Sequence, residues 1–537
     1  MLWQKESDAD GAVYTDLLQN TKLPLGEFRL NRTKNNAQSI HARAEGNQKY
    51  DQNDYTGAME LYNKSICFAE KGSEQLSLAY ADRSTCFLRL KLYDRCLVDI
   101  QLAKASNNQI PEHLMSKLNA REKECMKMKS KSSDATVAEH PTLSFDPHEK
   151  WPCMVNVLDI ERNDQYGRLV RANSDIQIGD TILIEESFIK ILHGTERNRC
   201  SNCVKEKMNF IPCDKCADTM YCDETCADNI FHEDECDMTM GAEDCYDGQS
   251  LPFILRSVII AINTFRTIVE LMKFVEECRA SDPLDITESV DTPISKYRTF
   301  FKLAVMMTNE RVSNLLKIAY VIFHSIMGSR LSKRFETKAS QRFLVHLIIH
   351  HAIILRVNAF GGCTEPSDGF FGQNVDDDDK QRQQDVNLLT SYFNHSCIPN
   401  VTILVKDSIA VCKAVRPIKQ GEQLFITYID DEGYSMTEKQ RNDYLELGYG
   451  FRCKCEFCQK GDKHKNIEQL QLDADFAYVA FNMPLFIQRS STNLIRQIKH
   501  HCVAFLEKYP VQSIASIEGG YILSTLSGLM QREIESR

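Results

Sequence analysis

The pattern of hydrophobic and polar positions changes several times along the chain and predicts alternating helical and β-rich segments. Apolar residues recur at helical spacing over residues 40–110, over most of residues 250–357, and again over residues 463–537. Short apolar runs separated by turn residues predict strands over residues 167–188 and 387–429. We therefore expect a multidomain α+β chain.

The first helical segment contains two similar copies of one pattern. Ala58 and Cys96 hold equivalent places 38 residues apart, and aromatic residues such as Tyr62 and Phe87 stand where they can fill the space between touching helices. This spacing resembles tetratricopeptide repeats, with an ordinary pair of helical hairpins as the alternative. Two repeats bury little surface, so we expect residues 40–110 to pack on the C-terminal helices or to bind a protein partner.

Composition indicates a folded chain of several domains. The chain has 537 residues, of which 43% are hydrophobic and 26% charged, so collagen-like and wholly disordered classes are excluded. A formal net charge of −11 argues against a broad nucleic-acid-binding surface. The first residues lack an apolar signal segment, and the most apolar run, Phe343 to Val357, is shorter than a membrane helix. We therefore expect a cytoplasmic or nuclear protein without a membrane partner.

The 21 cysteines carry the strongest chemical signal. In a reducing compartment, clustered cysteines bind metal more often than they form disulfides. Residues 200–236 contain enough paired ligands to fill two closed tetrahedral zinc sites, which leaves no open position for catalysis. These ligands are Cys200, Cys203, Cys213, Cys216, Cys222, Cys226, His232 and Cys236.

The order of these ligands resembles a MYND zinc finger. Phe231 stands where that family usually has tryptophan, and the spacer before His232 is short, which weakens the expectation of a peptide-binding role without affecting zinc binding. The resemblance implies interleaved sites, one zinc bound by Cys200, Cys203, Cys222 and Cys226, the other by Cys213, Cys216, His232 and Cys236.

Three later segments resemble a SET domain with its post-SET segment. They are residues 391–400, which read Ser-Tyr-Phe-Asn-His-Ser-Cys-Ile-Pro-Asn, residues 421–431, and residues 450–458. Residues 167–180 resemble the first strands of that domain. A SET domain interrupted by a MYND finger and a helical insertion is similar to the SET-and-MYND lysine methyltransferases, in the branch with N-terminal repeats.

This resemblance implies a division of the chain into nine segments. They are a polar arm over 1–38, the repeats over 40–110, a helix and linker over 111–150, the first SET part over 151–199, the finger over 200–236, a helical insertion over 237–350, the β-rich catalytic core over 351–432, the post-SET segment over 433–462 and C-terminal helices over 463–537.

By the same resemblance, the protein is expected to be a protein-lysine N-methyltransferase that uses S-adenosylmethionine. A lysine must lose its proton before it attacks a methyl group, and an apolar channel lowers its pKa. Tyr428 matches the tyrosine that orients the amine at the end of this channel. Leu169 stands where the family has a glycine, which lowers the expected cofactor affinity. Residues that match the family's cofactor contacts are Gly167, Arg168, Asn358, Asn394, His395, Tyr428 and Phe451.

A further zinc site is expected where the post-SET segment meets the catalytic core. Cys453, Cys455 and Cys458 offer three sulfur ligands, and Cys397 supplies a fourth. The sequence thus predicts three zinc ions and no disulfides.

Two other functional classes stay open. A catalytically weak adaptor would use the repeats or the finger to bind a co-repressor or chaperone in transcriptional repression; Leu169 and the short finger favour it. The other class, a purely structural zinc protein, does not explain Tyr428 and the motif around it. Asn394, His395 and Tyr428 favour the enzyme, for which we expect a monomer acting on a lysine of a protein substrate.

Overall fold

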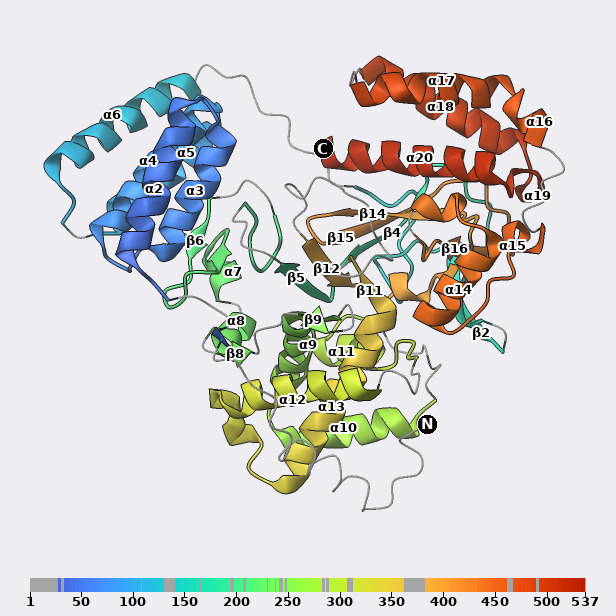
Figure 1. Ribbon diagram of the computed structural model, residues 1–537, viewed down its shortest axis with the longest axis horizontal. Coiled ribbons are helices and arrows are strands. Elements are labelled where there is room, and N and C mark those ends of the chain that lie inside the picture. The colour runs from blue at the N-terminus through green and yellow to red at the C-terminus, as the bar shows by residue number, and fades with distance from the viewer. Residues whose placement is uncertain are drawn as a thin grey trace.

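The fold is described by a computed structural model. Figure 1 shows the N-terminal helices and the C-terminal helices at opposite upper corners, the sheets between them, and a group of helices below. The structure describes residues 28–29, 33–107, 109–129, 141–164, 166–193, 198–205, 209–228, 230–236, 238–240, 245–246, 249–282, 285, 289–306, 312–361, 382–429, 431–460, 467–488 and 492–536. Most of the expected polar arm, residues 1–38, lies outside them.

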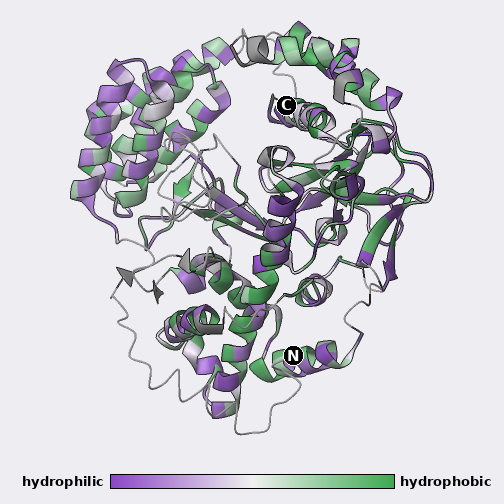
Figure 2. Cartoon of the chain, turned by 45° about the vertical axis from the view of Figure 1, so that its right-hand side comes forward, coloured by the Kyte–Doolittle hydropathy of each residue, from purple (hydrophilic) through white to green (hydrophobic). Residues whose placement is uncertain are grey.

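The N-terminal region is a stack of helices in which neighbours along the chain pack together. Ala58 and Cys96, the equivalent positions of the two copies, are fully buried between helices. Asn35, Asp54 and Ser73 cap three of the helices, since each side chain accepts a backbone N–H of the first turn. Figure 2 shows that hydrophilic (purple) and hydrophobic (green) residues alternate along these helices. The helices are α2 (Asn36–Asp51), α3 (Tyr55–Phe68), α4 (Glu74–Arg89), α5 (Tyr93–Ala105) and α6 (Glu112–Lys129).

Three sheets at the centre pair strands from before and after the finger and the insertion. In each sheet a strand before residue 200 is antiparallel to a strand after residue 380, so the interrupted domain closes as one unit. The sheets are, in order, β13 (Asn394–His395), β16 (Gln423–Ile426), β3 (Gly167–Ala172) and β2 (Leu158–Asn163); β14 (Val401–Lys406), β15 (Ile409–Ala414) and β4 (Thr181–Glu186); and β11 (Ala359–Phe360), β12 (Arg382–Val386) and β5 (Ile189–His193).

Helices of the insertion pack into the largest hydrophobic core together with these sheets. The last of them continues past the boundary expected at residue 350 and ends at Asn358, because its apolar run is unbroken. Among the described helices, none is both long and apolar enough to cross a membrane. The insertion comprises α9 (Leu251–Thr264), α10 (Ile268–Ala280), α11 (Pro293–Phe301), α12 (Val312–Met327), η2 (Arg330–Arg334) and α13 (Lys338–Asn358).

The cysteine-rich segment is small and has little regular structure. It contains β6 (Ile211–Pro212), β7 (Met220–Tyr221), α7 (Glu224–Ala227) and α8 (Ile230–Glu235), and short pairs β1 (Phe28–Arg29) with β8 (Thr239–Met240) and β9 (Cys245–Tyr246) with β10 (Gln249–Ser250) lie around it. The N-terminal helices pack on it through a shared hydrophobic cluster of Cys67, Cys200, Phe210, Met220 and Tyr221. The sequence predicted the C-terminal helices as the packing partner within the chain. The structure instead places the N-terminal helices on the cysteine-rich segment, through apolar side chains that no sequence motif marked.

C-terminal helices cover the sheet that contains β14. On that face, the side chain of Gln531 both accepts from and donates to the backbone of Val405, at 3.1 and 2.8 Å. The elements of this region are η3 (Thr390–Tyr392), η4 (Asp431–Tyr434), α14 (Glu438–Tyr449), α15 (Glu456–Lys460), α16 (Ile467–Gln471), α17 (Ala474–Gln488), α18 (Thr492–Lys508), α19 (Val511–Ile514) and α20 (Ile517–Ser536).

Candidate active site and metal centres

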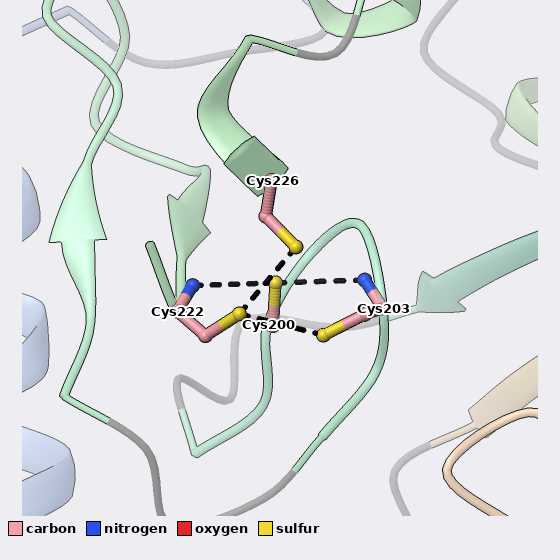
Figure 3. A group of neighbouring side chains, drawn as sticks. All are labelled: Cys200, Cys203, Cys222 and Cys226. Atoms are coloured by element: carbon pink, nitrogen blue, oxygen red, sulfur yellow. Dashed lines mark hydrogen bonds between the residues drawn. The ribbon is translucent and has the colours of Figure 1, made fainter. Parts of the chain in front are cut away.

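All twelve proposed metal ligands are brought together in three groups of four, with the ligand atoms of each group within 4.8 Å of one another. In the first group, Cys222 Sγ lies 3.5 Å from Cys203 Sγ and 3.4 Å from Cys226 Sγ, as Figure 3 shows together with Cys200. Four sulfurs around one zinc at about 2.3 Å would lie about 3.8 Å apart, whereas a disulfide needs about 2.0 Å. The spacing therefore fits a tetrahedral zinc site.

The second group contains a histidine whose two ring nitrogens are both engaged. Cys213 and Cys236 lie 3.8 Å apart between sulfurs, and His232 Nε2 lies 3.4 Å from Cys216 Sγ. His232 Nδ1 lies 3.4 Å from the hydroxyl of Thr219, a contact of the kind that orients a metal-binding histidine. This geometry leaves Nε2 directed at the ligand group.

A buried ion pair joins the second group to the SET region. Glu235, next to the ligand Cys236, receives two hydrogen bonds from Arg256, at 2.8 and 2.6 Å. Arg256 also donates to the carbonyl of Lys190 on β5, at 2.9 Å. With the N-terminal helices packed on its other side, the finger connects the helical repeats to the SET core.

The third group ties the catalytic core to the post-SET segment, because Cys397 and Cys458 lie 3.6 Å apart between sulfurs although they are far apart in sequence. Asn442 accepts the N–H of Cys453 at 2.6 Å. The buried guanidinium of Arg441 lies 3.8 Å from Cys458 Sγ, where its positive charge offsets the negative charge of cysteine thiolates. The spacing of the cysteines in the sequence predicted the ligands, but nothing in the sequence marked Asn442 or Arg441 as their supports.

Residues 394–400 run beside the strand that leads to Tyr428. Asn394 and His395 form a parallel pair with Phe425 and Ile426 of β16. Asn400 completes this contact, since its side-chain amide donates to Gln423 O at 2.9 Å and its carbonyl accepts the N–H of Phe425 at 2.7 Å. Residues 394–400 are therefore fixed against β16, the strand that directly precedes Tyr428.

Tyr428 is held at both ends. Its hydroxyl donates to the carbonyl of Phe393 at 2.7 Å, and its backbone N–H donates to His395 Nδ1 at 2.9 Å. Its ring lies 4.8 Å from that of Tyr449 and 6.3 Å from that of Phe451, between centroids. Burial raises the pKa of Tyr428 above its ordinary value, so the hydroxyl keeps its proton at neutral pH.

His395 links this aromatic group to the third metal-ligand group. Because Nδ1 accepts from Tyr428, the neutral ring carries its proton on Nε2, which lies 3.3 Å from Cys397 Sγ. Burial lowers the pKa of His395 to about 4. Both ring nitrogens are thus used inside the protein, so a cofactor contact at His395 would involve its backbone or the face of its ring.

The segment that follows α11 brings the other expected cofactor residues together. Arg168 donates to Lys302 O at 2.6 Å, and Asn358 donates to Ala304 O at 2.8 Å. Gly450, in the left-handed conformation with φ of 77°, packs so closely on Met306 that a Cβ would lie 2.5 Å from its sulfur. No motif in the sequence marked residues 302–306.

Asn394 connects the part of the candidate active site that lies after the insertion to the part that lies before the finger. Its amide donates to the carbonyl of Arg168 at 2.8 Å. Gly167 has φ of 67°, a conformation that favours glycine, whereas Leu169 is fully buried in regular strand β3. The left-handed position at the start of β3 is thus occupied by a glycine, while the Leu169 side chain packs into the core.

Comparisons with known proteins agree with this geometry. A family model described as SET domain matches residues 167–429. The chain is 23% identical over 503 residues to protein-lysine N-methyltransferase SMYD4 of Danio rerio, covering 78% of this chain and 65% of that protein. It is 23% identical over 555 residues to SMYD4 of Homo sapiens, covering 78% and 66%.

A shorter match involves N-lysine methyltransferase SMYD2 of Homo sapiens, 25% identical over 304 residues, which covers 56% of this chain and 59% of that protein. The matched part of the chain spans just under two thirds of the length of the first two relatives. The SET match, the similarity to these relatives and the four-ligand groups agree: the chain contains a SET domain and is similar to members of the SET-and-MYND-domain (SMYD) family.

Proposed function

We propose that this protein is an S-adenosylmethionine-dependent protein-lysine N-methyltransferase. The observation that carries the proposal is the fixed position of Tyr428, whose hydroxyl is bound to Phe393 O and whose ring lies among Tyr449, Phe451 and His395. The curated relatives are named protein-lysine N-methyltransferases, which supports the same activity here.

The chemistry of the residues fits the cofactor. Arg168 has a buried Nη1 with no hydrogen-bond partner among the described residues, which suits the carboxylate of an amino-acid group. Aromatic rings beside Tyr428 suit a sulfonium, because cations are attracted to ring faces. Residues that would hold the cofactor are Gly167, Arg168, Asn358, Asn394, His395, Tyr428 and Phe451. When bound, the cofactor supplies the methyl group.

The residues of this chain would act mainly by positioning. Tyr428 and Tyr449 would form the wall of a narrow, water-poor channel that favours the neutral form of a lysine amine. The Tyr428 hydroxyl and the backbone carbonyls near Phe393 would orient this amine toward the methyl group. Alignment of the two reactants lowers the entropic cost of the reaction. We further propose that the three ligand groups hold zinc, which would fix the finger and the post-SET wall.

The proposal is tested with the purified protein by titration calorimetry with S-adenosylmethionine and by transfer of radiolabelled methyl groups to cell extract and to lysine-containing peptides. Saturable binding together with labelled lysine is expected. Absence of both binding and labelling would leave the adaptor function.

We retain the adaptor, which would bind a co-repressor or chaperone, as a second candidate because residues 40–110 resemble tetratricopeptide repeats and fold as a stack of helices. Its use of the finger is less favoured, since the finger contacts α3–α5 on one side and α9 on the other. A protein lysine as substrate, a monomeric state and a cytoplasmic or nuclear location are parts of the same proposal.

A further inference from the structure

A buried carboxylate lies next to the candidate active site and is not used by the proposed function. Glu185 is on β4, opposite Ala410 of β15, and only 6% of its surface is exposed. No ion pair to Glu185 occurs within the described residues. Such a group is costly to bury unless hydrogen bonds replace its water.

Those hydrogen bonds all come from one short turn. Glu185 Oε1 accepts the backbone N–H groups of Leu388 and Leu389, both at 2.8 Å. Its Oε2 accepts the N–H of Thr390 at 2.9 Å and the hydroxyl of Thr390 at 2.7 Å. Four donors and no acceptor face the carboxyl group, so the ionised form satisfies all of them. One carboxylate thus fixes three successive peptide units.

Two of the residues whose N–H groups bind Glu185, Leu389 and Thr390, also hold the turn that contains Phe393, the residue that receives Tyr428. The carbonyl of Leu389 accepts the N–H of Tyr392 at 3.0 Å, and the carbonyl of Thr390 accepts the N–H of Phe393 at 3.2 Å. The carbonyl of Phe393 then accepts the Tyr428 hydroxyl at 2.7 Å. Hydrogen bonds and the short backbone segments of Thr390 and Phe393 therefore connect Glu185 through η3 to Tyr428.

We infer that Glu185 is a positioning residue of the active site: by fixing residues 388–390 it sets the place of the Phe393 carbonyl and, through it, the orientation of the Tyr428 hydroxyl. The inference rests on the proposed function for its effect on methyl transfer. Its structural half, the control of the turn by Glu185, is independent of that function.

The test uses Glu185→Gln in the full-length protein. Glutamine keeps the shape and one acceptor, but in either orientation its NH₂ group faces two donors that the carboxylate oxygen had accepted. Glu186→Gln is the matched control, because Glu186 is the next residue on the same strand and its side chain is 72% exposed, with an ion pair to Lys190. Thr390→Val removes the hydroxyl that donates to Glu185, and Thr390→Ser keeps a hydroxyl at this position.

Three measurements decide the inference. In Glu185→Gln and Thr390→Val, amide hydrogen exchange over residues 388–393 should accelerate roughly tenfold or more, and kcat should fall roughly ten- to a hundredfold with little change in cofactor affinity. Thr390→Ser and Glu186→Gln should resemble wild type in both respects. Combined with Tyr428→Phe, Glu185→Gln should cost little more than Tyr428→Phe alone, because the hydroxyl it orients is gone.

Unchanged exchange over residues 388–393 would overturn the inference, and so would fully additive losses in the double variant, which would mean that Glu185 acts on the fold in general. If the wild type neither binds the cofactor nor transfers methyl groups, the proposed function fails. The exchange measurement alone then decides whether Glu185 fixes residues 388–390. If Glu185→Gln does not fold, Thr390→Val against Thr390→Ser provides the same comparison.

Discussion

Arg83 and Asp99 form an ion pair with no exposed surface between α4 and α5, with hydrogen bonds of 2.8 and 2.7 Å. The same groups reach the finger: Arg83 donates to Phe210 O at 3.0 Å, and Asp99 accepts from Asn209 at 2.7 Å. One buried pair thus connects α4 and α5 and fixes Asn209 and Phe210, the two finger residues that precede β6.

Arg83→Leu should destabilise the protein by about 3–5 kcal/mol, because it leaves the carboxylate of Asp99 buried without a counter-charge. Zinc release from the finger to a chromogenic chelator should also become faster. Lys71→Ala is the control, since the pair of Lys71 with Asp214 joins the same two regions but its side chains are 72% and 62% exposed, so its loss should cost less than about 1 kcal/mol.

Urea unfolding measures both effects. The double variant Arg83→Met with Asp99→Leu should recover much of the lost stability, because an apolar pair replaces the buried ions. Equal stability of Arg83→Leu and Lys71→Ala would contradict the role assigned to the buried pair.

The purified protein should contain three zinc ions and no disulfide. Each of the three ligand groups has sulfur separations suited to zinc and too long for a disulfide. Elemental analysis together with thiol titration after denaturation provides the count. A ratio near two would remove one of the sites, and a ratio near zero would refute the whole metal assignment.

Cys455→Ser should weaken cofactor binding although Cys455 is not a cofactor residue. Its group includes Cys397, which contacts His395, and the rings of His395 and Phe451 lie 6.0 Å apart between centroids. Loss of one ligand should therefore loosen the aromatic wall. Cys153→Ser, outside every ligand group, is the control for calorimetry; equal affinities in the two folded variants would disprove the link.

Tyr428→Phe should reduce methyl transfer roughly 10²- to 10³-fold while cofactor binding stays nearly intact, because only the hydroxyl bound to Phe393 O is lost. Asn394→Ala should show the opposite order. Its amide holds Arg168 O, so cofactor affinity should fall first. Radiolabelled transfer and calorimetry separate the two, and an equally active Tyr428→Phe would show that the tyrosine has another role.

His351 should make the stability depend on pH. It is fully buried between Ser257 and Tyr297, at 2.9 and 3.0 Å, and burial keeps its pKa well below the ordinary value of 6.5. The folded state therefore stays unprotonated where the unfolded state binds a proton, and stability should fall as pH drops below about 6.5. His351→Gln should flatten this dependence in thermal unfolding from pH 7 to 5, whereas the exposed His113→Gln should follow wild type.

Local patterns along the chain predicted the N-terminal helices and the residues of the ligand groups, and the resemblance to a known family singled out Tyr428. Zinc ligands reveal themselves because the metal requires particular residues at short spacings, such as Cys200 with Cys203 and Cys453 with Cys455. Helical repeats and strands reveal themselves because one buried face repeats every 3.6 or 2 residues. Even the joining of Cys397 to the post-SET cysteines followed from counting ligands, since three sulfurs leave a tetrahedral site incomplete.

Only the tertiary structure decided how these parts are supported. Glu185 and residues 302–306 belong to no motif, because their partners lie far away in sequence and a long-range hydrogen bond leaves no periodic pattern. Arg83 is one charged residue among many until folding buries it against Asp99 and the finger. Local composition thus determined the chemistry available to the chain, and long-range packing determined which groups hold that chemistry in place.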